Sequence, residues 1–105
     1  MVSQLDLSYN ELCGIDDNGE GQYNAEGITA IADALRVNGA LTECNLQSNC
    51  LGAKGWTAIF TALRDSKVSK ISTWDLHAED GIKASIKPLA EYIAVSGALT
   101  EVLTF

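Results

Sequence analysis

An eleven-residue pattern occurs twice in the chain and constrains the fold more than any other feature. Residues 2–12 and 41–51 are both apolar at positions 1, 4, 6 and 11 of the pattern and carry Asn at position 9. Alternating apolar residues are typical of a short strand with one buried face, and an Asn amide can bond the backbone where the chain turns away. The pattern therefore predicts repeated strand units that stack and bury their apolar side chains between neighbours.

A helical pattern follows each strand unit. Apolar residues recur at the spacing i, i+3, i+4, i+7, which marks one face of a helix. Three such stripes occur: Ile28, Ile31, Ala32 and Leu35; Trp56, Ile59, Phe60 and Leu63; and Ile86, Leu89, Ala90 and Ile93. Asn24 is a predicted N-cap for the first helix. Pro88 fits only in the first turn of the third helix, so that helix should begin near Ser85.

The strand of the third unit is less regular. The sequence Gly-Ala-Leu-Thr-Glu at residues 39–43 recurs at 97–101, which corresponds to two repeats of 29 residues. A strand with Ile71, Trp74 and Leu76 at positions 1, 4 and 6 fits between them and is favoured. A register that begins at Val68 and uses Ile71 and Thr73 also fits.

The turn of the third unit should differ from the other two. Asn10 and Asn49 are the predicted structural turn residues of the first two units, whereas Glu79 or Asp80 takes this position in the third. A carboxylate accepts backbone hydrogen bonds but cannot donate one, so it replaces only part of what Asn provides. An irregular third turn is expected.

These strand frames, alternating with full helices at a period of 28–30 residues, resemble the ribonuclease-inhibitor-type leucine-rich repeats found in ribonuclease inhibitor, NOD-like receptors and Ran GTPase-activating proteins. The resemblance implies an α/β fold, a leucine-rich repeat solenoid (horseshoe) with parallel strands on the concave face and helices on the convex face. About three and a half repeats are expected in a single domain at 1–105, with repeats at 1–40, 41–70, 71–98 and a truncated repeat at 99–105.

The same resemblance implies that a partner binds mainly on the concave sheet. Residues between the buried positions of each strand should point outward. We predict a partner-binding face formed by Gln4, Asp6, Ser8, Tyr9, Glu43, Asn45, Gln47, Thr73, Asp75, His77 and Glu101, with Leu103 beside them and Tyr9 at the rim. This face is acidic and has no Lys or Arg, so a basic protein partner is favoured.

Charge and cysteine content narrow the classes of partner. Fourteen acidic against seven basic residues give a net charge of −7, which argues against nucleic acid and anionic membrane. No apolar run approaches the ~20 residues of a membrane-spanning helix. Cys13, Cys44 and Cys50 are odd in number and one occupies a core position, which favours reduced thiols and a cytoplasmic location over a disulfide framework.

The loop at 13–24 lengthens the first repeat and contains the one pattern that suggests a metal. Asp16, Asn18 and Glu20 imitate the start of a calcium-binding loop, but Gly27 stands where a bidentate Glu is required. We therefore expect no metal site and no cofactor. His77 lacks a recognisable nucleophile context and no phosphate-binding loop is present, so no catalytic residues are predicted and the chain is not expected to be an enzyme.

The predicted function is that of a protein–protein interaction scaffold, binding through the concave sheet face and the inserted loop. The alternative is a regulatory module of a GTPase-activating or nucleotide-sensing protein. No polar capping segment covers the apolar residues near either end, so we expect either a fragment of a longer repeat array or self-association through these ends. The apolar residues concerned are Val2, Leu5, Leu7, Val102, Leu103 and Phe105.

Overall fold

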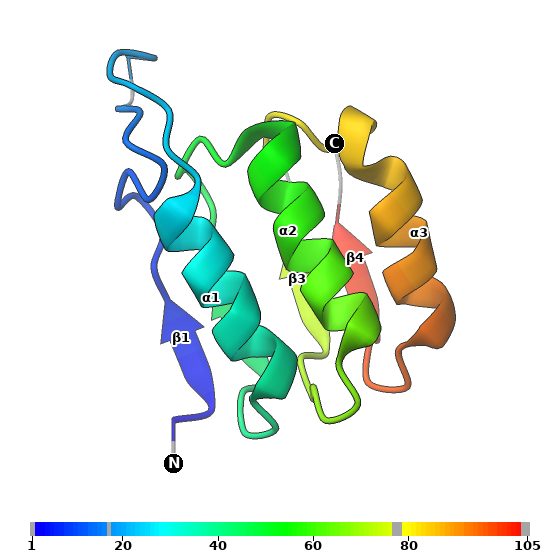
Figure 1. Cartoon of the computed structure of the whole chain (residues 1–105). Coiled ribbons are helices and arrows are strands. Elements are labelled where there is room, and N and C mark those ends of the chain that lie inside the picture. The colour runs from blue at the N-terminus through cyan, green and yellow to red at the C-terminus, as the bar shows by residue number, and fades with distance from the viewer. Residues whose placement is uncertain (1, 17, 77–78, 104–105) are drawn as a thin grey trace.

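The computed structural model describes residues 2–16, 18–76 and 79–103. Within these residues the chain forms an α/β fold in which helices cover one face of a parallel four-stranded sheet with the order β1-β2-β3-β4 (Figure 1). The strands are β1 (Gln4–Asp6), β2 (Glu43–Asn45), β3 (Thr73–Asp75) and β4 (Glu101–Leu103). The helices are α1 (Glu26–Val37), α2 (Gly52–Asp65) and α3 (Ile86–Val95), the last preceded by the 3-10 turn η1 (Lys83–Ser85). No helix in this part of the chain is long and apolar enough to cross a membrane.

The strand register confirms the favoured position of the third strand. Glu43 of β2 pairs with Thr73 of β3, so position 3 of the second frame lies beside position 3 of a frame that starts at Ile71. Ile71, Trp74 and Leu76 are all buried. Val68, which the other register required in the core, is 48% exposed. The alternative register is therefore wrong.

The core lies between the sheet and the helices and contains the predicted stripes of α1 and α2. Ile28, Ala32 and Leu35 of α1 are buried, and Ile31 packs partly buried against them. In α2 the whole stripe of Trp56, Ile59, Phe60 and Leu63 is buried. Burial of these stripes against the sheet is the main source of stability for helices of this length.

The predicted stripe of α3 is right at Leu89 and wrong at Ile86, Ala90 and Ile93. Ser85, Leu89 and Tyr92 are buried, whereas Ile86 and Ile93 are about half exposed, at 51% and 49%, and Ala90 is exposed. The buried face of the helix is rotated relative to the predicted face because two polar residues, Ser85 and Tyr92, are buried with hydrogen-bond partners. The Ser85 hydroxyl donates to the Gly81 carbonyl at 2.8 Å, and the Trp74 indole N–H donates to the Tyr92 hydroxyl at 3.2 Å.

The predicted ends of the helices lie close to the observed ones. Pro88 is the third residue of α3, in the first turn where its missing N–H costs no helical hydrogen bond. Asn24 precedes the residue at which α1 is capped, Ala25, and its side-chain oxygen accepts the Glu26 N–H at 2.8 Å. Asn24 thus satisfies a backbone donor at the start of α1, one residue earlier than a standard N-cap.

The inserted loop folds back on itself and contacts the following repeat. A short antiparallel bridge joins Ile15 to Gly21. Gly21 has a φ of +123°, and a Cβ there would lie 2.1 Å from the Gly14 carbonyl oxygen, so a larger residue is excluded. Asp16 Oδ1 accepts the N–H groups of Asn18 and Glu20, both at 2.9 Å. The Tyr23 hydroxyl donates to the carbonyl of Leu51, just before α2.

Candidate functional site

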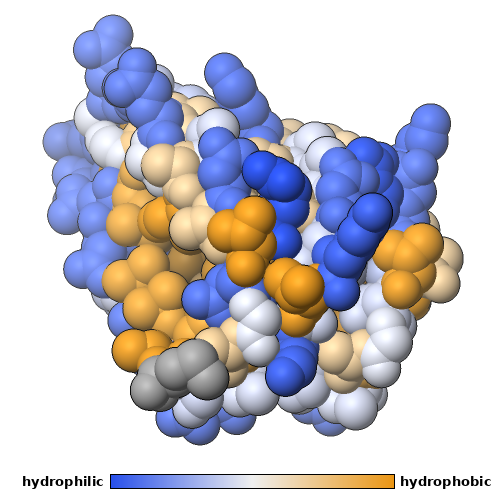
Figure 2. Space-filling view, turned by 60° about the horizontal axis from the view of Figure 1, so that its bottom comes forward, coloured by the Kyte–Doolittle hydropathy of each residue, from blue (hydrophilic) through white to orange (hydrophobic). Residues whose placement is uncertain are grey.

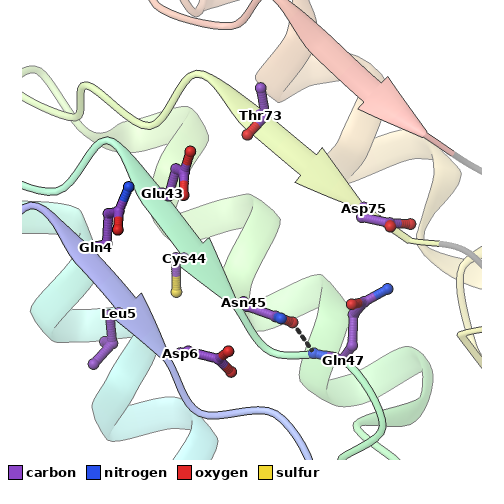
Figure 3. Close-up of a pocket in the computed structure, with 9 residues that line it drawn as sticks. All are labelled: Gln4, Leu5, Asp6, Glu43, Cys44, Asn45, Gln47, Thr73 and Asp75. Atoms are coloured by element: carbon purple, nitrogen blue, oxygen red, sulfur yellow. Dashed lines mark hydrogen bonds between the residues drawn. The ribbon is translucent and has the colours of Figure 1, made fainter.

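A hollow of about 480 Å³ lies on the face of the sheet opposite the helices (Figure 3). Its lining comes from three neighbouring strands and the turn after β2. The lining residues are Gln4, Leu5, Asp6, Glu43, Cys44, Asn45, Gln47, Thr73 and Asp75. Seven of these nine belong to the face predicted from strand alternation; Leu5 and Cys44 are the two that it left out.

Parallel pairing places the outward side chains in rows across the sheet. Gln4 pairs with Glu43, which pairs with Thr73, and Asp6 pairs with Asn45. In Figure 3 Asp75 continues the second row on β3. Neighbours in such rows are about 5 Å apart, so an extended ligand segment lying across the strands could contact side chains from several strands at once.

Local hydrogen bonds fix the side chains at the carboxyl ends of β1 and β2. Asp6 Oδ1 accepts the Ser8 N–H at 2.9 Å and the Ser8 hydroxyl at 2.6 Å. These two bonds stabilise the carboxylate and lower the pKa of Asp6. Asn45 Oδ1 accepts the Gln47 N–H at 3.0 Å in the same way (Figure 3). The same side-chain-to-backbone turn therefore recurs in neighbouring repeats.

The hollow is acidic. Asp6, Glu43 and Asp75 line it, and Glu101 on β4 extends the charge because it pairs with Thr73. No Lys or Arg is among the lining residues that the structure describes. Carboxylates of one sign on a concave surface create a negative potential that attracts cationic groups.

The one cysteine in the lining is a poor nucleophile. Cys44 is only 6% exposed. Burial raises its pKa to about 11, with a further contribution from the negative charge of Asp6. The side chain is therefore a neutral thiol near neutral pH, and the thiolate that nucleophilic chemistry requires is disfavoured.

Asn49 organises the turns that border the hollow. It is fully buried, and its Nδ2 donates to the carbonyls of Leu7 and Leu46 at 2.9 and 3.0 Å. Its Oδ1 accepts the N–H of Asn10 at 2.7 Å. Asn10 itself is exposed, and its side chain bonds only within its own turn, donating to the carbonyls of Leu7 and Ser8. The two Asn positions are thus alike in sequence but unequal in structure.

Glu79 lies at the position after β3 that corresponds in sequence to Asn49 after β2. Its carboxylate accepts the Ser48 N–H of the preceding turn at 3.1 Å, so the acceptor part of the Asn role is kept. Burial raises the pKa of Glu79 and outweighs the lowering by the Ser48 bond, and the nearby charges of Asp80 and Asp75 raise it further. The third turn is therefore held by a carboxyl group that resists ionisation.

The other predicted residues lie around the hollow or cannot be placed. Ser8 is partly buried beside Asp6, and Glu101 is exposed on β4. Tyr9 is 72% exposed, at a turn position with a φ of 59°. His77 lies outside the described residues. Among the residues that are described, no group of three or more His, Cys, Asp or Glu side chains is arranged to hold a metal ion.

A second hollow, of about 510 Å³, lies beside the start of α1 and is lined by residues of both charges, including Glu26 and Lys54. Its mixed lining offers no single recognition chemistry.

No protein-family model matches the chain, and comparisons with curated proteins and with solved structures gave no significant match. Inference about function therefore depends on the geometry and charge of the sheet face.

Proposed function

We propose that the chain is a protein-interaction scaffold that binds a basic segment of a partner protein across β1, β2 and β3. The observation that carries the proposal is the hollow itself, in which Asp6, Glu43 and Asp75 lie among amide side chains and none of the described lining residues is Lys or Arg. A Lys- or Arg-rich segment would supply donors to these carboxylates and to the amide oxygens between them. None of the described residues of the inserted loop lines the hollow, so the proposal rests on the sheet face.

We further propose that the fold is a short leucine-rich repeat solenoid of the ribonuclease-inhibitor type. The support is a ladder of equivalent backbone bonds between repeats. The N–H of Thr42 donates to the Ser3 carbonyl at 2.7 Å, that of Ser72 to Thr42 at 3.0 Å, and that of Thr100 to Ser72 at 2.7 Å. Each donor occupies position 2 of its frame, as its acceptor does, which is the relation expected of stacked copies of one unit.

A role in binding, without catalysis, agrees with the chemistry of the face. Its carboxylates are exposed, and the thiol of Cys44 is held neutral by burial. We propose a reducing compartment such as the cytoplasm, because Cys13 and Cys44 are buried thiols and none of the three cysteines is in a disulfide.

The test is a fluorescence anisotropy titration with a labelled decalysine peptide at low ionic strength. One variant combines Asp6→Asn, Glu43→Gln and Asp75→Asn, which neutralises the hollow and keeps its shape. The matched control combines Glu20→Gln, Glu26→Gln and Asp33→Asn, all exposed and away from the hollow, so that both variants lose the same charge. Loss of several exposed ion pairs should weaken binding of the hollow variant about tenfold.

The control variant should bind decalysine within about twofold of the parent chain, because general attraction between unlike charges falls off over a screening length of about 10 Å. Equal weakening in both variants would show that net charge alone attracts the peptide and would contradict a site on the sheet. Circular dichroism spectra of the parent and both variants should superimpose.

A further inference from the structure

The outer side of α3 is apolar where the same side of α2 is polar. Toward α3, α2 presents Thr57, whose hydroxyl lies 3.3 Å from the Ser85 hydroxyl, and Arg64, whose Nη1 donates to Glu91 at 3.2 Å. The residues 29 positions later are Ile86 and Ile93, which are 51% and 49% exposed. The side of α3 that corresponds to an internal helix junction is therefore uncovered and hydrophobic.

On the opposite side of the molecule, α1 likewise has an exposed apolar residue where α2 has a polar one. Asp65 lies on the side of α2 that faces α1, and its pKa is lowered first by its bond from Arg64 and also by the charge of Arg36 on α1. The residue 28 positions before Asp65 is Val37, which is 65% exposed. Val2 beside β1 is equally exposed.

The two apolar surfaces lie at opposite sides of the molecule. In Figure 2 hydrophobic residues gather mainly on the left, the side of β1 and α1, with smaller patches in the centre and at the right, the side of α3. Each surface adjoins a terminal strand of the sheet, β1 on one side and β4 on the other. Burial of apolar area at such an edge would therefore come with continued strand pairing.

The backbone ladder gives the two sides complementary hydrogen-bonding groups. In each junction the N–H and hydroxyl of the later repeat donate to the carbonyl of the earlier one: Thr42 to Ser3, Ser72 to Thr42 and Thr100 to Ser72. Ser3 is the first residue of the described series, so its N–H is a donor with no acceptor earlier in the series. Thr100 is the last, so its carbonyl is an acceptor with no donor later in the series. The direction of the ladder is the same throughout.

We propose that a second copy of the chain stacks head to tail on this one, with α3 and β4 of one copy against α1 and β1 of the next. Ile93 of one copy then meets the partner's Val37, which forms an apolar pair. The contacts between neighbouring helices within one chain are charged at this place, where Arg64 pairs with Glu91 and Arg36 lies near Asp65. Ser3 of the second copy donates to Thr100 and extends the ladder. A head-to-tail contact of this kind does not close on itself in a dimer, so longer assemblies form as concentration rises.

The test is sedimentation equilibrium of the full chain across a wide range of concentration, with Ile93→Glu, Val37→Arg and the control Val68→Glu. Val68 is as exposed as Ile93 but lies in the loop between α2 and β3. The parent chain and the control should rise in average mass with concentration. Each of the other two variants alone should associate at least about tenfold more weakly.

Mixing Ile93→Glu with Val37→Arg decides the direction of the contact. In a head-to-tail stack the new carboxylate of one variant meets the new guanidinium of the other, so the mixture should regain association that neither has alone. A parent chain that stays monomeric at every concentration would overturn the proposal. Weakening by Ile93→Glu that is not rescued in the mixture would indicate a two-fold contact of α3 with itself and would overturn it as well.

Discussion

Replacing Asn49 by Ala should be among the most destabilising single substitutions in the chain. The side chain is fully buried and bonds two turns at once, accepting the Asn10 N–H and donating to the carbonyls of Leu7 and Leu46. Alanine fits the space but supplies none of these groups. Since the Leu7 carbonyl also accepts a bond from Asn10 Nδ2, it keeps one partner. The Leu46 carbonyl and the Asn10 N–H lose the bonds described here.

The size of the effect follows mainly from these two orphaned groups, because the further bond from the Leu12 N–H to Asn49 Oδ1 is long, at 3.4 Å. A buried or partly buried polar group left without a partner costs about 1–3 kcal/mol, so Asn49→Ala should lower the free energy of unfolding by about 3 kcal/mol. Asn10→Ala removes only bonds within an exposed turn and should cost about 1 kcal/mol or less. The difference between these variants measures the contribution of the bond between turns.

Urea unfolding followed by circular dichroism provides the assay, with the slope of the transition checked for two-state behaviour. Asn49→Asp serves as a further control, because it keeps the acceptor oxygen but places a negative charge against the carbonyls of Leu7 and Leu46. It should therefore be at least as destabilising as Asn49→Ala. If Asn49→Ala cost no more than Asn10→Ala, the reasoning from buried hydrogen bonds would be refuted.

Three further predictions test other parts of the structure. Burial raises the pKa of Glu79, so the stability contributed by its protonated carboxyl group is fully present below the ordinary pKa of 4.5 and is lost as the pH rises through the raised pKa. Glu79→Gln should therefore be more stable than the parent chain near neutral pH, and this advantage should disappear in acid. A difference in urea unfolding that stays constant with pH would contradict this. Leu89→Ala should cost about 2–4 kcal/mol and Ile93→Ala less than about 1 kcal/mol in the monomer, and similar costs for the two would restore the stripe read from the sequence, in which both residues are buried. A thiol reagent should label the partly buried Cys50 before the two buried cysteines, and simultaneous labelling without unfolding would contradict the described burial.

The strand positions were predictable from the sequence because one buried face enforces a strict alternation. Leu46 and Trp74 are buried where the frame requires it, and Asn45 and Asp75 stand on the opposite face. Seven of the nine residues that line the hollow followed from this alternation. Leu5 and Cys44 did not, because the alternation assigns them to the buried face.

The face of α3 was not predictable from apolar spacing, because its buried side uses polar atoms. Ser85 is buried against Gly81 and Ala53, whose carbonyls it bonds, and the Tyr92 hydroxyl accepts the Trp74 N–H. A hydropathy pattern counts such residues as exposed. The inequality of Asn10 and Asn49 was also hidden, since the Asn49 side chain bonds the turn at residues 7–10 whereas the Asn10 side chain bonds within its own turn.

Backbone amide chemical-shift mapping with the decalysine peptide would locate the binding surface on the chain. Binding across the sheet predicts that the largest changes occur in β1, β2 and β3, at Gln4, Asp6, Glu43, Asn45 and Thr73, with smaller changes in the helices. Changes that are largest in α1, α2 or the inserted loop, or that spread evenly over the chain, would contradict a binding site on the acidic sheet face.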